Sequence, residues 1–302
     1  MLRRLLRHAM TLRIFREPQP GMVAHTKASK LLARSDVNSF MAFHPEIGWP
    51  TAAKTLDALQ KWPSSEEPDE TAFSLADNAG GSIYDAFARD QERALRFAAG
   101  MEVFGALPRF NMSSAVDGFD WKSLGQAKVV DVGGSRGHLA VALAQRFPQL
   151  TFVVQDMEKV VDEGRETLTP ELHGRINFMA HDFFKPQGVS ADVYLLRTIL
   201  HNWSDKYCVA ILRALVPALK PGAKVLINEI CLPEPGSMPA HLEAELRLMD
   251  LSMGSIFNGK ERDSAEWKAL LTQADSRFEL QTIVQPSGSS LAMIEVNWCA
   301  DS

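Results

Sequence analysis

Five short runs of β-branched and aliphatic residues, which begin at Ala127, constrain the fold more than any other feature of the sequence. Helical stretches separate the runs, which read AKVVDV, TFVVQD, INFMAHD, ADVYLLR and AKVLINEI. Such an alternation predicts parallel strands that are joined by crossover helices.

The last two apolar runs of the chain predict a different connection. FELQTIVQ at 278–285 and SLAMIEVNW at 290–298 are separated only by PSGS, which is too short for a crossover helix. We therefore expect an α/β domain over residues 119–302, a Rossmann-like sheet of parallel strands closed by a C-terminal antiparallel hairpin. This ending is unusual for a plain dinucleotide-binding sheet.

Residues 1–118 carry a helical apolar pattern that is broken at EPQPG (17–21) and PSSEEPDE (63–70). The chain has 302 residues, of which 46% are hydrophobic, so two domains are expected and wholesale disorder is excluded. We predict a mostly helical N-terminal domain over residues 1–118. The spacing of Leu2, Leu5, Leu6, Ala9 and Met10 predicts that the first helix faces a core.

The charge balance excludes a general attraction to nucleic acid or anionic lipid, because 32 basic and 37 acidic side chains leave a net charge of -5. The basic excess is local, since residues 1–34 contain six Arg and two Lys against Glu17 alone. An arginine-rich start is also compatible with a mitochondrial presequence. No membrane span or secretory signal is visible, and three scattered cysteines suit a reducing compartment, so we expect a cytoplasmic protein.

A glycine turn follows the first predicted strand and opens a helix, in the sequence VVDVGGSRGH. Glycines there allow a sharp turn and a close approach to a ligand at the helix N-terminus. A dinucleotide fingerprint requires glycine where Val132 stands, and a P-loop requires a lysine that is missing after Gly137. NAD and ATP are therefore disfavoured.

Three carboxylates, Asp131, Asp156 and Asp182, end successive predicted strands, where open α/β sheets bind ligands. Asp156 is placed to accept ribose hydroxyls, and Phe183 and Phe184 beside Asp182 are placed to pack on a purine. This set suits an adenosine with a zwitterionic, cationic tail better than a pyrophosphate. Each Asp alone is equally compatible with a helix cap or a turn.

Six motifs in this order resemble the S-adenosylmethionine-dependent O-methyltransferases of the caffeate and flavonoid type, in their fungal secondary-metabolite branch. They are DVGGSRGH, QDM, HDFF, LRTILHNWSD, LKPGAKVLINE and NGKERD, and the strong match covers roughly residues 120–298. The resemblance implies a Rossmann-like catalytic domain behind a winged-helix dimerisation domain. It also implies S-adenosylmethionine as cofactor and S-adenosylhomocysteine as product.

The same resemblance implies the cofactor-binding residues. It matches Gly133 to the methionine tail, Asp156 to the ribose, and Asp182 with Phe183 to adenine. The full predicted set is Asp131, Gly133, Gly134, Asp156, Asp182, Phe183 and Arg197. Arg197 stands where the family usually has lysine. Ser135 replaces a common glycine, which is tolerable where that position does not need a positive φ. The leading helices that interlock two subunits in the family have no counterpart here, so we expect a weakened homodimer.

His201 follows the fourth predicted strand, so its imidazole is expected at the carboxyl edge of the sheet. A histidine suits the task of taking a proton from a phenol near neutral pH. Glu229 ends the adjacent strand and is predicted to orient the imidazole, whereas Glu261 joins this catalytic set only through the family resemblance. The alternative role for His201 is a cap or a stacking partner of Trp203.

The helix that contains LRLMDLSMGSIF is expected to contribute a substrate wall of Met249, Asp250 and Met253, with Trp203 beside it. Equally, a methionine stripe is often simply core. The histidines show no HxxxH or HExxH spacing, and His201 with Asp205 is more typical of a cap or ion pair, so no metal site is expected.

The leading functional hypothesis is methylation of a hydroxyl on a phenolic or polyketide-like small molecule, with His201 as general base. The alternative from the same family is a pericyclase that holds the cofactor without consuming it. A third hypothesis, a winged-helix DNA-binding protein, is motivated by the basic segment. Its arginines do not form one helical stripe, so we expect no nucleic-acid partner.

Overall fold

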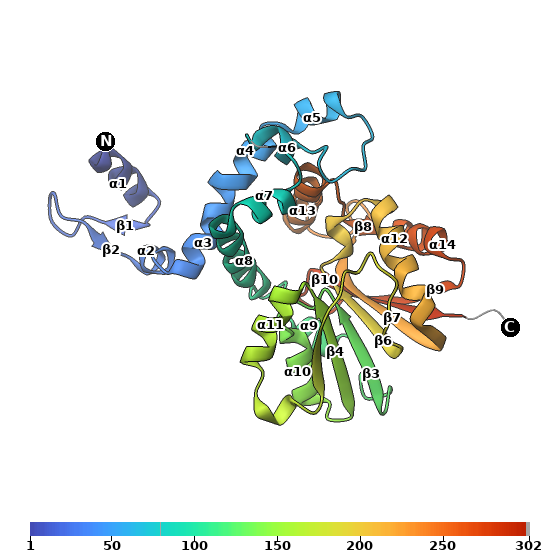
Figure 1. Cartoon of the computed structure of the whole chain (residues 1–302). Helices are drawn as coiled ribbons and strands as arrows, with labels where there is room; N and C mark the ends of the chain where they lie inside the picture. Colours follow the sequence, from blue (N-terminus) through green and yellow to red (C-terminus); the bar gives the residue numbers. More distant parts are fainter. Residues whose placement is uncertain (79, 300–302) are drawn as a thin grey trace.

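An extended mixed sheet forms the centre of the second half of the chain (Figure 1). The computed structural model describes residues 1–78 and 80–299. The strands lie in the order β5-β4-β3-β6-β7-β10-β9, and β8 pairs with β7 alone. Their bounds are β3 Ala127–Val132, β4 Leu150–Asp156, β5 Ile176–Ala180, β6 Ala191–Arg197, β7 Leu219–Leu232, β8 Arg262–Asp263, β9 Phe278–Val284 and β10 Leu291–Trp298.

The pairing of these strands confirms the predicted α/β fold. Strands β3 to β7 pair in parallel, while β10 is antiparallel to both β7 and β9. The strand order reverses at β3, which has β4 on one side and β6 on the other. Such a reversal opens a crevice at the carboxyl ends of the strands, where ligands of open α/β sheets bind.

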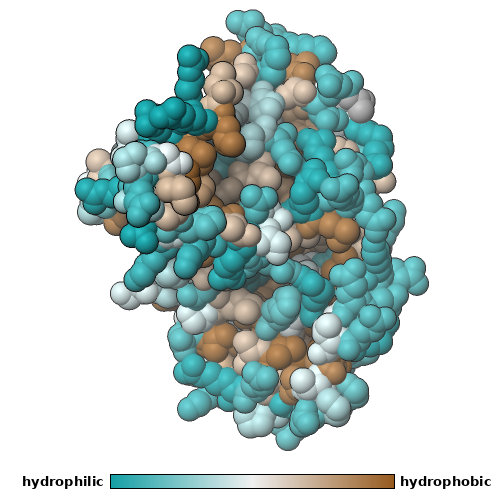
Figure 2. All heavy atoms as spheres, turned by 90° about the vertical axis from the view of Figure 1, so that its left-hand side faces the viewer, coloured by the Kyte–Doolittle hydropathy of each residue, from teal (hydrophilic) through white to brown (hydrophobic). Residues whose placement is uncertain are grey.

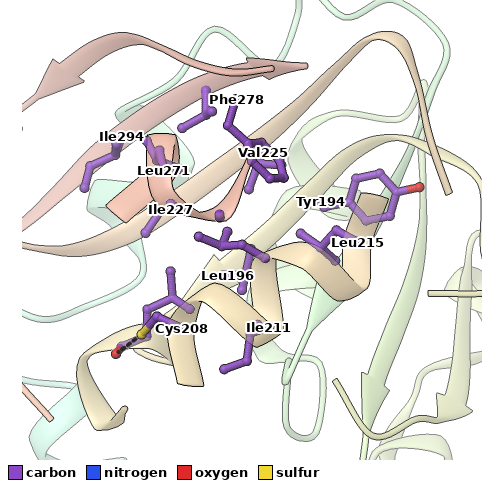
Figure 3. Packing of buried hydrophobic residues seen from close by; sticks show 14 of the residues in the cluster. Tyr194, Leu196, Cys208, Ile211, Leu215, Val225, Ile227, Leu271, Phe278 and Ile294 are labelled. Atoms are coloured by element: carbon purple, nitrogen blue, oxygen red, sulfur yellow. Dashed lines mark hydrogen bonds between the residues drawn. The ribbon is translucent and has the colours of Figure 1, made fainter. Parts of the chain in front are cut away.

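Helices cover both faces of the sheet. One core packs the sheet against α12 (Asp205–Leu215) and α14 (Ser264–Ala274), as Figure 3 shows, and the other packs it against α10 (His138–Arg146) and α11 (Glu158–Thr167). Short helical turns η2 (Pro170–Leu172), η3 (Leu200–Asn202) and η4 (Val216–Ala218) join these elements. The crossover helix expected between β5 and β6 is absent, because residues 181–190 form a loop. Ten residues of extended chain suffice to reach from the edge strand to β6.

The first half of the chain is mostly helical, as predicted. Its elements are α1 Leu2–Thr11, β1 Phe15–Arg16, β2 Ala24–His25, α2 Lys27–Leu32, α3 Ser35–Phe43, the π-helical turn η1 His44–Gly48, α4 Trp49–Ala52, α5 Thr55–Lys61, α6 Ala72–Ala76, α7 Ile83–Arg89, α8 Gln91–Gly105 and α9 Ser113–Asp117. Helix α13 (Ala240–Phe257), from the second half, packs into this helical region through Met253, Ile256 and Phe257. The winged-helix assignment and the boundary at residue 118 remain predictions.

The prediction that the first helix faces a core is wrong for this chain. Helix α1 has no buried residue, and Leu2 and Leu5 are 69% and 60% exposed. Helix α1, the β1–β2 ribbon and α2 project away from the sheet in Figure 1, and Figure 2 views the molecule from that side. The apolar spacing correctly gave the helix, but a periodicity does not reveal whether a partner covers the apolar face.

None of the helices in residues 1–78 and 80–299 combines the length and the apolar character that a membrane crossing requires.

Candidate functional site

The glycine turn after β3 is shaped for a ligand that approaches the backbone. Gly133 has a φ of +68°, and a Cβ there would lie 2.5 Å from Cδ1 of Ile199. A Cβ on Gly134 would lie 2.5 Å from the carboxyl carbon of Asp131. The positive φ of Gly133 and both close approaches require glycine at these two positions, because neighbouring side chains already occupy the space of a Cβ.

Asp131 lies beneath this turn as a buried carboxyl group. It is 2% exposed, and its Oδ2 has no hydrogen-bond partner among the described residues. Burial raises the pKa of Asp131 to about 7, against the opposing effect of the Arg197 guanidinium. An unpartnered buried carboxylate is costly without a donor or cation beside it, so Asp131 is suited to a cationic ligand group.

Asp156, at the end of β4, is joined directly to the turn. Its Oδ2 accepts a hydrogen bond from the backbone N–H of Ser135 at 2.9 Å, and Oδ1 accepts one from Met157 N–H at 2.8 Å. Burial raises the pKa of Asp156. The Asp156 carboxylate therefore lies beside the glycine turn. That Asp156 binds the ribose remains a prediction.

Serine at position 135 was expected to be tolerable only if the residue did not need a positive φ, and the structure contradicts that condition. Ser135 adopts a φ of +52°, so this position does favour glycine. The short Ser135 N–H to Asp156 contact holds the residue in that conformation. The turn therefore stores backbone strain of order 1 kcal/mol at the edge where the ligand is expected.

The other predicted cofactor residues lie on the same edge with differing surroundings. Asp182 is exposed and its Oδ1 accepts the N–H of Phe184 within its own turn. Phe183 packs within 3.9 Å of the position of a Gly133 Cβ, so an aromatic ring does border the turn. Arg197 donates to Asn228 Oδ1 at 3.0 Å and to the Phe110 carbonyl at 2.6 Å, which ties the helical region to β6.

His201 lies with Glu229 and Glu261 in one buried cluster, which confirms the predicted proximity. Its Nδ1 is 2.9 Å from Glu261 Oε1 and 3.9 Å from Glu229 Oε2. Both glutamates are fully buried, and 15% of the histidine side chain is exposed. A hydrogen bond through Nδ1 fixes the ring, so that Nε2 of the neutral imidazole is the atom that can take a proton from a bound molecule.

The orienting hydrogen bond that was expected of Glu229 is made by Glu261. Glu261 makes the hydrogen bond to the imidazole, whereas Glu229 Oε1 accepts the backbone N–H groups of Ile199 and Leu200 at 2.7 and 2.8 Å. Glu229 therefore caps the short helical turn η3 that carries His201. The predicted strand adjacency was correct, since Arg197 pairs with Asn228, the neighbour of Glu229.

Strand β8 explains how a residue 60 positions away reaches His201. Its residue Arg262 pairs in parallel with Cys231 at the end of β7, which brings the preceding Glu261 to the sheet edge. The backbone N–H of Glu261 donates to Asp250 Oδ1 at 2.9 Å, so α13 fixes it from the other side. This two-residue strand carries no recognisable β pattern, and only the family resemblance pointed to Glu261.

The electrostatics of the cluster favour a protonated histidine in the free protein. Burial lowers the pKa of His201, but the Glu229 and Glu261 carboxylates outweigh it and raise the pKa to about 9. Glu229 Oε2 and Glu261 Oε2 have no hydrogen-bond partner among the described residues, so the imidazolium is the cation that compensates them. These three groups also offer ligand atoms within 4.8 Å of one another; the expectation of no metal site remains a prediction.

The residues of the predicted substrate wall differ in their burial. Met253 is 8% exposed and belongs to the core between α13 and the N-terminal helices, while Met249 and Asp250 are half-buried. Trp203 stacks on Tyr84 of α7, with ring centroids 5.5 Å apart and planes 11° apart. An aromatic surface next to His201 therefore joins the two halves of the chain, and Tyr84 was not anticipated from the sequence.

Sequence reasoning missed two further residues beside His201. A Cβ on Gly259 would lie 2.1 Å from the His201 carbonyl oxygen, so this glycine permits the segment 258–263 to pack on the histidine turn. Arg262 is completely buried against the same turn. Their only signal was their place in NGKERD, because the contacts span more than 50 residues of chain.

Comparisons with known proteins identify the family of this chain. Residues 58–277 match the O-methyltransferase domain family. The O-methyltransferase PaMT of Phomopsis amygdali is 45% identical over 298 residues, which cover 98% of this chain and 70% of that protein. The chlorophenol O-methyltransferase of Trichoderma longibrachiatum is 38% identical over 305 residues, with coverage of 98% and 65%.

A solved structure shows the same fold at lower identity. LepI in complex with S-adenosylmethionine superposes with a TM-score of 0.78 and 24% identity, covering 98% of this chain and 76% of that one. The family match and the close relatives extend across both halves of the chain. The chain therefore belongs to the S-adenosylmethionine-dependent O-methyltransferases.

Proposed function

We propose that this enzyme methylates a hydroxyl group of a phenolic or polyketide-like small molecule, with His201 as the general base. The observation that carries the proposal is the buried contact of 2.9 Å between His201 Nδ1 and Glu261 Oε1. That contact holds the ring at the carboxyl edge and reserves Nε2 for the acceptor. The chlorophenol O-methyltransferase, similar over nearly the whole chain, supports a phenolic acceptor.

The residues at the glycine turn suit S-adenosylmethionine. Gly133 and Gly134 leave the backbone free of side chains, Asp131 offers an unpartnered buried carboxylate, and Asp156 stands next to them. Asp131 suits the cationic part of the cofactor and Asp156 the ribose hydroxyls. S-adenosylmethionine supplies, when bound there, the electrophilic methyl group for the acceptor oxygen.

The protein's own part in the chemical step is proton removal and alignment. With S-adenosylmethionine bound, the new oxygen–carbon bond would form as the carbon–sulfur bond breaks and S-adenosylhomocysteine leaves. The proton of the acceptor O–H group would pass to Nε2 of His201 in its neutral form. The Glu261 and Glu229 carboxylates stabilise the resulting imidazolium. Trp203, which Tyr84 holds by stacking, is an aromatic side chain two residues from His201 and can help to orient a planar acceptor.

A methyl-transfer assay tests this proposal. The enzyme is incubated with methyl-labelled S-adenosylmethionine and a panel of phenols, with the corresponding methyl ethers as controls that lack a hydroxyl. We expect label in the ether product and one S-adenosylhomocysteine per product, with no reaction of the controls. A rearranged product with the cofactor unconsumed would instead identify a pericyclase, and label in a compound without a hydroxyl would exclude O-methylation.

A further inference from the structure

Arg262 is a fully buried arginine whose guanidinium group makes several hydrogen bonds and packs against an aromatic ring. It is 0% exposed, and its Nε and one terminal nitrogen donate to the same oxygen, Asp205 Oδ1, at 2.9 and 2.8 Å. The guanidinium carbon lies 5.3 Å from the centre of the Trp267 ring. Burial of such a cation is costly, so its remaining contacts require a reason.

Two of those contacts reach the backbone on either side of His201, and others go to the Lys260 carbonyl and to Cys208 Sγ. One terminal nitrogen of Arg262 donates to the Leu200 carbonyl at 3.3 Å, and the other donates to the Trp203 carbonyl at 3.0 Å. These two residues flank His201 and Asn202. Cys208 Sγ contacts the same two carbonyls at 3.1 and 3.3 Å, and the dashed line at Cys208 in Figure 3 marks its contact with a carbonyl oxygen.

The segment that carries His201 needs support of this kind. Thr198, just before it, adopts a φ of +52°, a strained conformation for a β-branched residue. Glu229 binds the N–H groups at the start of the segment, those of Ile199 and Leu200. An anion therefore holds the donors of the turn, and a cation holds its acceptors.

We propose that Arg262 is a positioning residue, which fixes the carbonyls of Leu200 and Trp203 and thereby sets the place of the His201 imidazole. This inference rests on the proposed role of His201 as the base. A guanidinium group can reach both carbonyls and Asp205 at once because its donors form a rigid planar fork. An ammonium group in the same place has its three N–H donors on one nitrogen atom and cannot reach all three acceptors.

The guanidinium charge also acts on the histidine. The charged groups that face His201 are Glu229 on β7, Glu261 before β8, and Arg262 on β8. The two carboxylates raise the pKa of the imidazole, and the Arg262 charge opposes them. Loss of this charge should move the acid limb of the rate profile to higher pH, an effect that a purely structural residue would not produce.

Three variants test the inference with a phenolic substrate that the wild type methylates. Arg262→Met removes the charge and the hydrogen bonds, whereas Arg262→Lys keeps the charge. Arg213→Met is the matched control, since Arg213 also donates to two carbonyls, those of Gln273 and Ala274, but does so at the far end of α14. Each variant is measured for melting temperature, S-adenosylhomocysteine affinity, kcat, KM and pH profile.

We expect Arg262→Met to lower kcat about 10- to 100-fold, as a misplacement of about 1 Å does. Its S-adenosylhomocysteine affinity should change less than about threefold, and its acid limb should lie at higher pH. Arg262→Lys should also lower kcat but leave the acid limb of the pH profile in place. The control Arg213→Met should keep the wild-type kcat and the wild-type acid limb. If Arg262→Met does not fold, Arg262→Lys decides, and a wild-type kcat in either variant would overturn the proposal.

The proposed function and this inference fail in different ways. Wild-type rates in His201→Gln would remove the base itself, whatever Arg262 does. The second failure leaves His201 in place. In that case His201→Gln is slow, but the kcat of Arg262→Met falls only in proportion to its folded fraction and its pH profile does not move. Such a result would exclude the positioning role of Arg262 alone.

Discussion

Replacement of Glu261 by glutamine should shift the pH at which the enzyme becomes active. The carboxylate lies 2.9 Å from His201 Nδ1 and, with Glu229, holds the imidazole pKa at about 9 despite burial. Glutamine keeps an oxygen that accepts the Nδ1 proton, so the ring orientation survives while the charge is lost. An opposite charge at this distance changes a pKa by roughly 1 to 3 units, so the pKa of His201 should fall by about that amount in the variant.

The size of the effect follows from the proton equilibrium. At pH 7.5, roughly 3% of an imidazole with a pKa of about 9 is neutral, against roughly half when the pKa equals the pH. The acid limb of kcat/KM in Glu261→Gln should therefore lie roughly 1 to 3 pH units below that of the wild type. Its plateau should be lower, because a weaker base drives proton transfer less well.

Rates of methyl transfer between pH 6 and 10, with one phenol for all enzymes, check this prediction. The ionisation of the phenol is common to every profile, so only the limb that belongs to the enzyme can move. Glu295→Gln is the matched control, because Glu295 pairs with Lys224 in the same sheet at 2.6 Å and does not touch His201. An acid limb that stays in place, or moves to higher pH, would refute the assignment of that limb to His201.

Three further changes have defined outcomes. Ser135→Gly should stabilise the fold by up to about 1 kcal/mol, because it removes the strain of a φ of +52°; a lower melting temperature would contradict this. Gly259→Ala should destabilise it by about 1 to 3 kcal/mol in denaturant titrations, since the new Cβ would meet the His201 carbonyl at 2.1 Å; unchanged stability would show that the segment can move away. Asp156→Ala should weaken S-adenosylhomocysteine binding by about 1 to 3 kcal/mol in calorimetry, and undiminished binding would remove Asp156 from the site.

The sheet could be predicted from the sequence because its signals are local. Each β-branched run became a strand, and the short PSGS connection forced the antiparallel hairpin of β9 and β10. Glu229 was placed near His201 by the same reasoning, since neighbouring parallel strands bring their carboxyl ends together. The predicted hydrogen bond between Glu229 and the His201 ring was nevertheless wrong, because Glu229 accepts backbone N–H groups instead.

The remaining features depend on contacts between distant segments. Glu261, Gly259 and Arg262 reach the histidine turn through a two-residue strand that has no periodic pattern. The exposed face of α1 and the positive φ of Ser135 are also invisible to local reasoning, because apolar spacing and residue type do not report the surroundings. The family resemblance supplied Glu261, but no pattern supplied the bonds of Arg262.

The most direct test of the account is the rate of methyl transfer by His201→Gln when cofactor and phenol are saturating. We predict a fall of roughly 10²- to 10⁴-fold in kcat, the usual contribution of a positioned base. S-adenosylhomocysteine affinity should stay close to that of the wild type, and the remaining rate should follow only the ionisation of the phenol. A His201→Gln enzyme that methylates at the wild-type rate between pH 6 and 10 would contradict the account, and alignment alone would then explain catalysis.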